Sequence, residues 1–175
     1  FVATADNVLA TDHCVVLGNK KAKAMLTEHL TAALAFCGID SLDIYMDEEE
    51  VPALDGSSKQ WVNLFEKAGI EKPLLFKPQK YTVSEPIYYL NGKTSLVILP
   101  SDELYISYAV NYNHPDLTRR WEAYNPKAKQ EIIEARTFGF YKDLKKFQML
   151  GFAQGVTLEN TLGLKDIGFT SDLRS

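Results

Sequence analysis

The stretch LTEHLTAALAFCGIDSLDIYMD, residues 26–47, carries the clearest structural pattern of the chain. Its apolar residues recur at the spacing of one helix face and predict a helix over residues 22–37. Gly38 is well placed to end that helix in the left-handed conformation. Apolar and mostly polar residues then alternate over residues 41–47, which predicts a half-buried strand. The residues of the helix face are Leu26, Leu30, Ala33, Leu34 and Cys37.

An acid and a histidine stand side by side in this helix. His29 falls at the edge of the apolar face, and Glu28 lies about 100° further round the helix. A histidine in that position could bind a metal, and the adjacent carboxylate could accept a proton. From these residues alone the simpler interpretation is a hydrogen-bonded boundary histidine beside a solvated glutamate. The pattern therefore leaves both roles open.

The flanking segments predict a strand–helix–strand–helix order. The apolar run 14–17 reads as a strand that Gly18 and Asn19 close with a turn. After residue 47, an Asp55-Gly56 turn precedes Ser57 and Ser58, either of which can cap a helix that ends at Gly69. Asx-turn chemistry explains Asp55, so we expect its role to be structural.

The second half of the chain has a different amino-acid composition. Residues 71–80 hold two prolines and three lysines and are taken as a linker. Residues 80–115 are rich in Tyr, Val and Ile, with an Asn91-Gly92 hairpin signal, and predict three successive antiparallel strands. Helices are expected from Asn125-Pro126 to about 135, and over 141–150 with Gly151 as the stop. The order predicts two α+β domains in series.

Composition excludes several classes of function. The chain has 175 residues, a formal net charge of −4 and a pI near 5.4, which argues against an electrostatic nucleic-acid binder. No apolar run approaches the roughly 20 residues that span a bilayer, and the N-terminus does not resemble a signal peptide. Two cysteines are too few for a disulfide framework, so two free thiols in a reducing cytosol are expected.

Common catalytic motifs are missing from the sequence. The histidines are His13, His29 and His114, none in an HExxH motif, and no serine stands in a GxSxG elbow. Cys14 beside His13 is a poor nucleophile pair, because neighbours in a strand point to opposite faces. We interpret Cys14 as a small buried hydrophobe and His114 as structural.

Several longer motifs resemble one enzyme family. ADNVLATDHCVVLGN (5–19) and LTEHLTAALAFCGIDSLDIYMDEEEVPALDGSS (26–58) are similar to the first domain of the UDP-3-O-acyl-N-acetylglucosamine deacetylases, the zinc amidases of lipid A synthesis. In the second half, VNYNHP (110–115) and EARTFGFYKDLKKFQMLGFAQGVTLENT (134–161) resemble the same family. The similarity runs in order through nearly the whole chain, although Leu26 replaces the first threonine of the family's T-x-E-H pattern.

The resemblance implies a fold and a chemistry. The fold would be two similar α+β domains, each a small sheet with two helices, packed helix layer to helix layer around a metal site. By resemblance His29 is a zinc ligand and Glu28 the general base that takes a proton from the zinc-bound water, whose pKa zinc lowers to about 7. Thr137 would donate a hydrogen bond to the oxyanion, and Phe138 would pack on the substrate.

An apolar passage for the acyl chain of the substrate is also implied. The residues that match its lining are Leu144, Ala153, Thr157 and Thr161. These four residues fit ordinary core and loop positions equally well. The loop 152–157 reads FAQGVT where the family usually has L-x-L-G-G-S, which bears on the acyl length that the passage accepts.

The family's later H-K-x-x-D zinc motif and general-acid histidine have no counterpart here. We therefore expect a piece of a longer enzyme, with a first domain over 1–72 and a second over 73–175 that each lack one end. Because a catalytic zinc needs three protein ligands, such a piece should bind zinc weakly and be inactive alone.

The alternative hypothesis is a truncated, non-catalytic relative that binds an acylated nucleotide sugar or a protein partner. For the enzyme we expect an acylated UDP-glucosamine substrate, a cytoplasmic location and proximity to the membrane periphery. No nucleic-acid partner is expected. Incomplete domains would expose apolar surface, so self-association is a further expectation.

Overall fold

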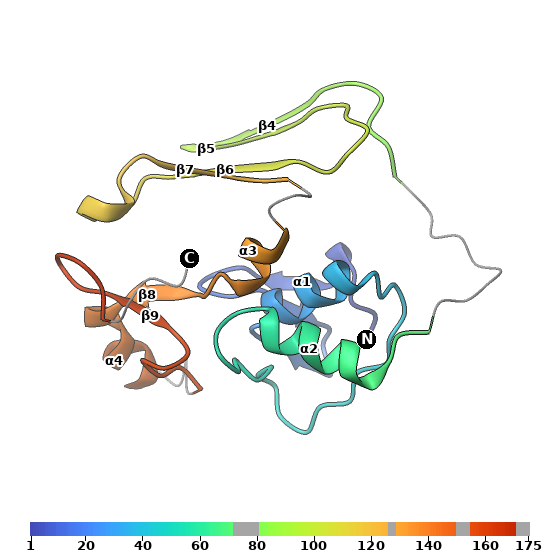
Figure 1. Ribbon diagram of the computed structural model, residues 1–175, viewed down its shortest axis with the longest axis horizontal. Coiled ribbons are helices and arrows are strands. Elements are labelled where there is room, and N and C mark those ends of the chain that lie inside the picture. The colour runs from blue at the N-terminus through green and yellow to red at the C-terminus, as the bar shows by residue number, and fades with distance from the viewer. Residues whose placement is uncertain (72–80, 126–128, 150–154, 171–175) are drawn as a thin grey trace.

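The computed structural model describes residues 1–71, 81–125, 129–149 and 155–170, and its fold is of the α+β class (Figure 1). The expected linker, apart from Glu71, lies outside the described residues, as do Gly151 and Ala153. The boundary between residues 72 and 73 and the packing of two helix layers therefore stay predictions. None of the described helices is long and apolar enough to cross a bilayer.

The first part of the chain builds a small sheet and two helices. After a short 3-10 turn, η1 (Ala5–Asn7), an antiparallel sheet holds β1 (Val8–Ala10), β2 (Val16–Gly18) and β3 (Lys23–Ala24) in that order. The expected helix 22–37 is shorter than predicted, because α1 spans Glu28–Cys37. Its predicted first turns are instead β3, paired with β2, and Leu26, whose φ of 59° does not fit a right-handed helix.

The predicted C-terminal ends of the first two helices are confirmed. Gly38 closes α1 with φ 67° and ψ 35°, the left-handed conformation that glycine adopts without strain. The second helix, α2 (Lys59–Ala68), begins after the Asp55-Gly56 turn and ends at Gly69. Ser57 Oγ accepts a hydrogen bond from the Lys59 N–H at 3.1 Å and so satisfies a free donor of the first turn.

The predicted strand over residues 41–47 is wrong. No described strand pairs with this segment, and only Glu50, beyond its end, forms an isolated parallel bridge with Met25. Leu42 and Ile44 remain about half exposed. The alternation of apolar residues was present, but a strand also requires a neighbour to receive its backbone hydrogen bonds.

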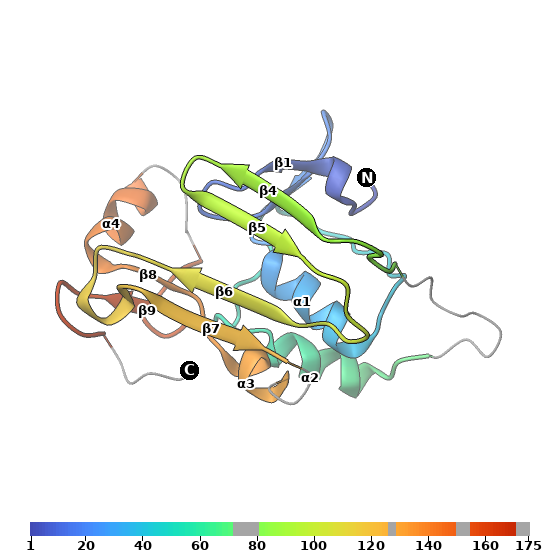
Figure 2. The ribbon, with the colours of Figure 1, turned by 90° about the horizontal axis from the view of Figure 1, so that it is seen from above.

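Two hairpins form a layer over the helices (Figures 1 and 2). In the first, β4 (Ile87–Asn91) pairs with β5 (Thr94–Ile98), so the predicted hairpin is present, but its turn is Gly92-Lys93 and Asn91 is the last residue of β4. In the second, β6 (Ile106–Val110) pairs with β7 (Arg120–Tyr124) across the 3-10 turn η2 (Pro115–Leu117). The three expected strands are therefore present as β4, β5 and β6, but they do not form one antiparallel run, because β5 and β6 belong to separate two-stranded sheets and β6 pairs with β7, which was not predicted.

Two helices and two short strands complete the fold. The expected helix from 125 to 135 is α3 (Lys129–Glu134), and α4 (Tyr141–Met149) lies where the second helix was predicted. Between them β8 (Phe138–Phe140) pairs in parallel with β9 (Leu162–Leu164), neither of which was predicted. Ala33 of α1, Val62 of α2 and Ile133 of α3 pack together as one buried cluster. This core fixes α3, and through it β8, against the first two helices.

Candidate active-site pocket

A cavity of about 210 Å³ lies between the start of α1, the turn before α2, and the β8–α4 segment. Its lining is mainly apolar, with a few polar groups, which is typical of ligand sites. Six of the eight predicted site residues line it, namely Glu28, His29, Thr137, Phe138, Leu144 and Thr161. Thr157 is exposed and not part of the lining, and Ala153 lies outside the described residues. What each residue does there stays a prediction.

The backbone of Val15 holds the start of α1 and orients the acid. The N–H of Val15 donates to Glu28 Oε2 at 3.2 Å, and its carbonyl accepts a hydrogen bond from Thr27 Oγ1 at 3.2 Å. Thr27 is buried, so this contact is shielded from solvent. One carboxylate oxygen of Glu28 is thereby fixed by a backbone donor, while the residue lines the cavity.

His29 is half-buried beside Glu28 and is tied to the next helix. Its carbonyl accepts a hydrogen bond from Ser58 Oγ at 3.1 Å, which joins α1 to the residue before α2. Burial lowers the pKa of the His29 imidazole, and the carboxylates of Glu28 and Asp55 oppose that shift without reversing it. The neutral imidazole is therefore favoured at pH 7, and neutral imidazole is the form that binds a metal.

Thr137 is placed by backbone contacts to both parts of the chain. Its N–H donates to the Gly56 carbonyl at 2.7 Å, and its carbonyl accepts from the Leu162 N–H at 3.0 Å. Gly56 has φ 79°, and a methyl group there would lie 1.7 Å from the carbonyl oxygen of Asn160. Only glycine allows this approach, which brings the turn before α2 against β8 and the loop that leads to β9.

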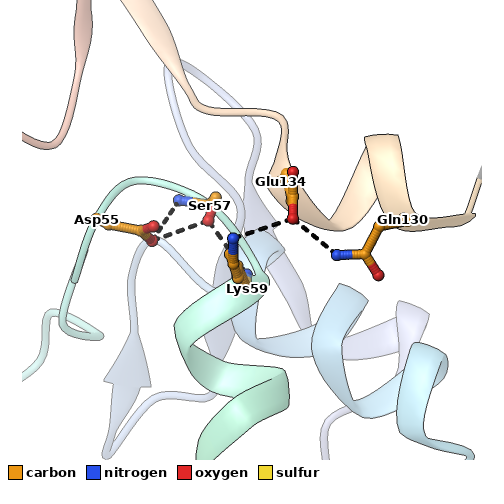
Figure 3. Close-up of polar contacts among 5 residues, drawn as sticks. All are labelled: Asp55, Ser57, Lys59, Gln130 and Glu134. Carbon is orange, nitrogen blue, oxygen red and sulfur yellow. Dashed lines mark hydrogen bonds and ion pairs between the residues drawn. The ribbon is translucent and has the colours of Figure 1, made fainter. Parts of the chain in front are cut away.

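Asp55 has the structural role that was expected of it. Its Oδ1 accepts from the N–H and the Oγ–H of Ser57 at 3.2 and 2.8 Å, an Asx turn in which Ser57 is fully buried (Figure 3). Lys59 at the start of α2 then contacts Glu134 of α3 at 3.0 Å, and Gln130 donates to the same carboxylate oxygen at 2.8 Å. This chain of contacts joins the two parts of the fold beside the pocket.

Other lining residues were missed or interpreted differently. His13 and Cys14 were assigned to a strand, but β2 begins only at Val16 and His13 has φ 65° in the preceding loop. Both line the pocket, as does Glu50, whose Oε1 accepts from the Gly155 N–H at 3.4 Å. No motif or spacing singled out Glu50, because its approach to Gly155 depends on contacts between distant segments.

The described residues do not form a complete zinc site. Within them no three His, Cys, Asp or Glu side chains are grouped so that they could hold a metal ion. A catalytic zinc usually has three protein ligands, of which His29 fits one. His114 is not a candidate, because it is 3% exposed and both ring nitrogens are used. Its Nε2 lies 2.7 Å from the Lys165 carbonyl, and its Nδ1 accepts from the Asp116 N–H at 3.2 Å, so it is structural as expected.

Comparison with known proteins gives one consistent result. A family model described as UDP-3-O-acyl N-acetylglycosamine deacetylase matches residues 1–174. A curated UDP-3-O-acyl-N-acetylglucosamine deacetylase from Leptospira biflexa serovar Patoc is 36% identical over 173 residues, which cover 95% of this chain and 56% of the relative. Its counterpart from Nautilia profundicola is 32% identical over 171 residues, covering 95% and 58%. The chain thus spans little more than half the length of these relatives.

Proposed function

Because the chain belongs to the UDP-3-O-acyl N-acetylglycosamine deacetylase family, we propose that it carries part of the active site for removing the N-acetyl group of UDP-3-O-acyl-N-acetylglucosamine, in lipid A biosynthesis. The observation that supports this most is the pocket, where Glu28 and His29 of α1 meet Thr137 and Phe138 of the β8 segment. An amide hydrolase needs a base, a means of activating water and a donor for the oxyanion. These residue types could supply all three.

In the proposed reaction Glu28 accepts a proton from the attacking water. The Val15 N–H holds one of its carboxylate oxygens, so the other is available to the pocket. Zinc dependence is part of the proposal, with His29 as one ligand and the others outside the described residues. Bound zinc would lower the pKa of its water to about 7, where a carboxylate can accept the proton.

Thr137 is proposed to stabilise the tetrahedral intermediate. Its backbone is fixed on both sides by Gly56 and Leu162, so its hydroxyl can be held at one place in the pocket. A preorganised donor of this kind stabilises developing negative charge without reorganising during the reaction. Phe138 beside it would pack on the sugar or acyl portion of the substrate.

The acyl chain is proposed to occupy the apolar part of the cavity. Leu144, Thr161 and the two loop residues Val156 and Leu158 are among the residues that line the cavity. Ala153 and Thr157 remain candidates for the same passage on the resemblance alone. An acyl chain fits a cavity whose lining is mostly aliphatic and aromatic.

The test is acetate release from UDP-3-O-acyl-N-acetylglucosamine by the complete gene product. Glu28→Gln should lower kcat by about 10²–10⁴-fold, since it removes a general base while keeping an acceptor for the Val15 N–H. Glu66→Gln on the exposed side of α2 is the matched control and should be unaffected. Acetate release by Glu28→Gln at the control rate would refute the proposal. Binding of the substrate by the unmodified protein without any acetate release would favour the non-catalytic alternative.

A further inference from the structure

Asn160 closes the loop 155–161 on itself. It is 9% exposed, and its side chain makes three hydrogen bonds within this loop. Oδ1 accepts from the Thr157 N–H at 2.7 Å and from Thr161 Oγ1 at 3.2 Å, and Nδ2 donates to the Gly155 carbonyl at 2.7 Å. These bonds use three of the four that an asparagine side chain can make, so the residue determines the shape of the loop.

The same loop supplies one wall of the pocket. Val156, Leu158 and Thr161 line the cavity, whereas Asn160 itself does not. Asn160 is thus placed behind the surface that the proposed acyl chain would touch. A change in the loop's shape would move three lining residues together.

The backbone of Asn160 also touches the part of the site that holds Thr137. Its carbonyl oxygen lies against the α-carbon of Gly56, so closely that a methyl group there would overlap it. Gly56 in turn accepts the hydrogen bond from the Thr137 N–H at 2.7 Å. Asn160 therefore connects the wall of the passage to the residue proposed to bind the oxyanion.

The acid and the histidine are held by different contacts. Glu28 is fixed by the Val15 N–H, and the backbone of His29 by Ser58 Oγ. Neither contact involves the loop 155–161. Loss of the Asn160 side chain should therefore disturb the passage and leave the geometry at the start of α1 in place.

We propose that Asn160 is a positioning residue that sets the shape of the acyl passage and its alignment with Thr137, and so determines which acyl length the enzyme prefers. This inference rests on the proposed function. Asn160 acts through the loop 155–161 and makes no contact with substrate.

The experiment compares kcat/KM of the complete gene product for UDP-3-O-acyl-N-acetylglucosamine substrates that differ in acyl length. Asn160→Ala should reduce the preference for the best chain over one several carbons shorter by at least about tenfold, the scale at which pocket shape discriminates methylene groups. Asn160→Asp keeps both acceptor bonds but turns a carboxylate oxygen toward the Gly155 carbonyl in place of the Nδ2 donor, so it should change the preference in the same direction. Asn63→Ala, the same truncation at an exposed position of α2, should leave the preference unchanged.

Amide hydrogen exchange gives a readout that does not depend on turnover. In Asn160→Ala, exchange should become faster at Thr157, whose N–H loses its acceptor. It should stay unchanged at Thr31, whose N–H bonds to the Thr27 carbonyl in the first turn of α1. Faster exchange at both positions would show general destabilisation and would overturn the local role.

The outcomes separate this inference from the proposed function. An equal loss of kcat/KM at every acyl length, with the preference unchanged, overturns the role of Asn160 while the deacetylase activity stands. No acetate release from any substrate by the unmodified protein refutes the proposed function and the acyl preference with it. In that case exchange at Thr157 still decides whether Asn160 positions the loop.

Discussion

Substitution of Gly56 by alanine tests the contact that joins the two parts of the fold. The added methyl group would lie 1.7 Å from the Asn160 carbonyl oxygen, which is backbone and cannot rotate away. The chain must therefore shift at this point. Because the Gly56 carbonyl accepts a hydrogen bond from the Thr137 N–H, the shift also strains this bond, which positions Thr137.

The cost has two parts. A left-handed conformation, here φ 79°, costs a non-glycine residue about 1–2 kcal/mol. Overpacking against fixed neighbours adds about 1–3 kcal/mol. We therefore expect Gly56→Ala to lower the free energy of unfolding by about 2–5 kcal/mol.

Gly38→Ala is the matched control. Gly38 has a similar φ of 67°, but a methyl group there meets no atom within 4 Å. Its substitution should lower the free energy of unfolding only by the cost of the left-handed conformation, about 1–2 kcal/mol. The difference between the two variants isolates the contact with Asn160.

Urea denaturation of both variants and the unmodified protein, followed by circular dichroism, measures these costs. Gly56→Ala should show the lower midpoint with a similar slope, or fail to fold where Gly38→Ala folds. Equal midpoints for the two variants would refute the close approach of Gly56 and Asn160, and with it the described position of Thr137.

Three other predictions concern single groups. Burial is the main cause that raises the pKa of the Cys37 thiol, and the nearby Glu66 carboxylate raises it further. In a variant that lacks Cys14, alkylation of Cys37 should therefore begin at a higher pH in the folded chain than in the chain unfolded by urea. Because the folded-state pKa exceeds the unfolded one, the associated stability is full below the unfolded pKa and is lost as the pH rises through the folded value. Lys59→Met should lower the free energy of unfolding by less than about 1 kcal/mol, an effect that 1 M salt should abolish in a urea titration, since Lys59 and Glu134 are both partly exposed. Thr137→Val should lower kcat for acetate release by about 10²-fold with an unchanged unfolding midpoint, because the backbone bonds of residue 137 remain; an unchanged kcat would exclude the oxyanion role.

Local signals in the sequence predicted local features of the fold well. Gly38 and Gly69 end helices as expected, and the Asn91-Gly92 signal marks the expected hairpin, whose turn begins at Gly92. These features depend on the conformation of one or two residues, which the amino-acid type largely determines.

Pairing between distant segments was not predictable in the same way. Residues 41–47 alternate like a strand but have no described partner, while β8 and β9, only three residues each, pair across the α4 segment without any periodic signal. Register and partner choice depend on tertiary contacts, which no short window of sequence contains.

The candidate site was likewise predictable only where its features are local in the sequence. Glu28 and His29 were a candidate pair because they are neighbours in the sequence. Their chemical roles, and the choice of Thr137, came from the resemblance to the family. The contact of Gly56 with Asn160 had no signal in the sequence, because a glycine after Asp55 is already explained by the turn.

We propose that the pocket between α1 and β8 is a water-activating metal centre in which His29 is a ligand. Anomalous diffraction at the zinc absorption edge, from crystals of the complete gene product grown with zinc, tests it most directly. We predict a zinc peak about 2.0–2.1 Å from an imidazole nitrogen of His29, in the cavity that Glu28 and Thr137 line. A zinc peak elsewhere, with the His29 imidazole bound to no metal, would contradict it.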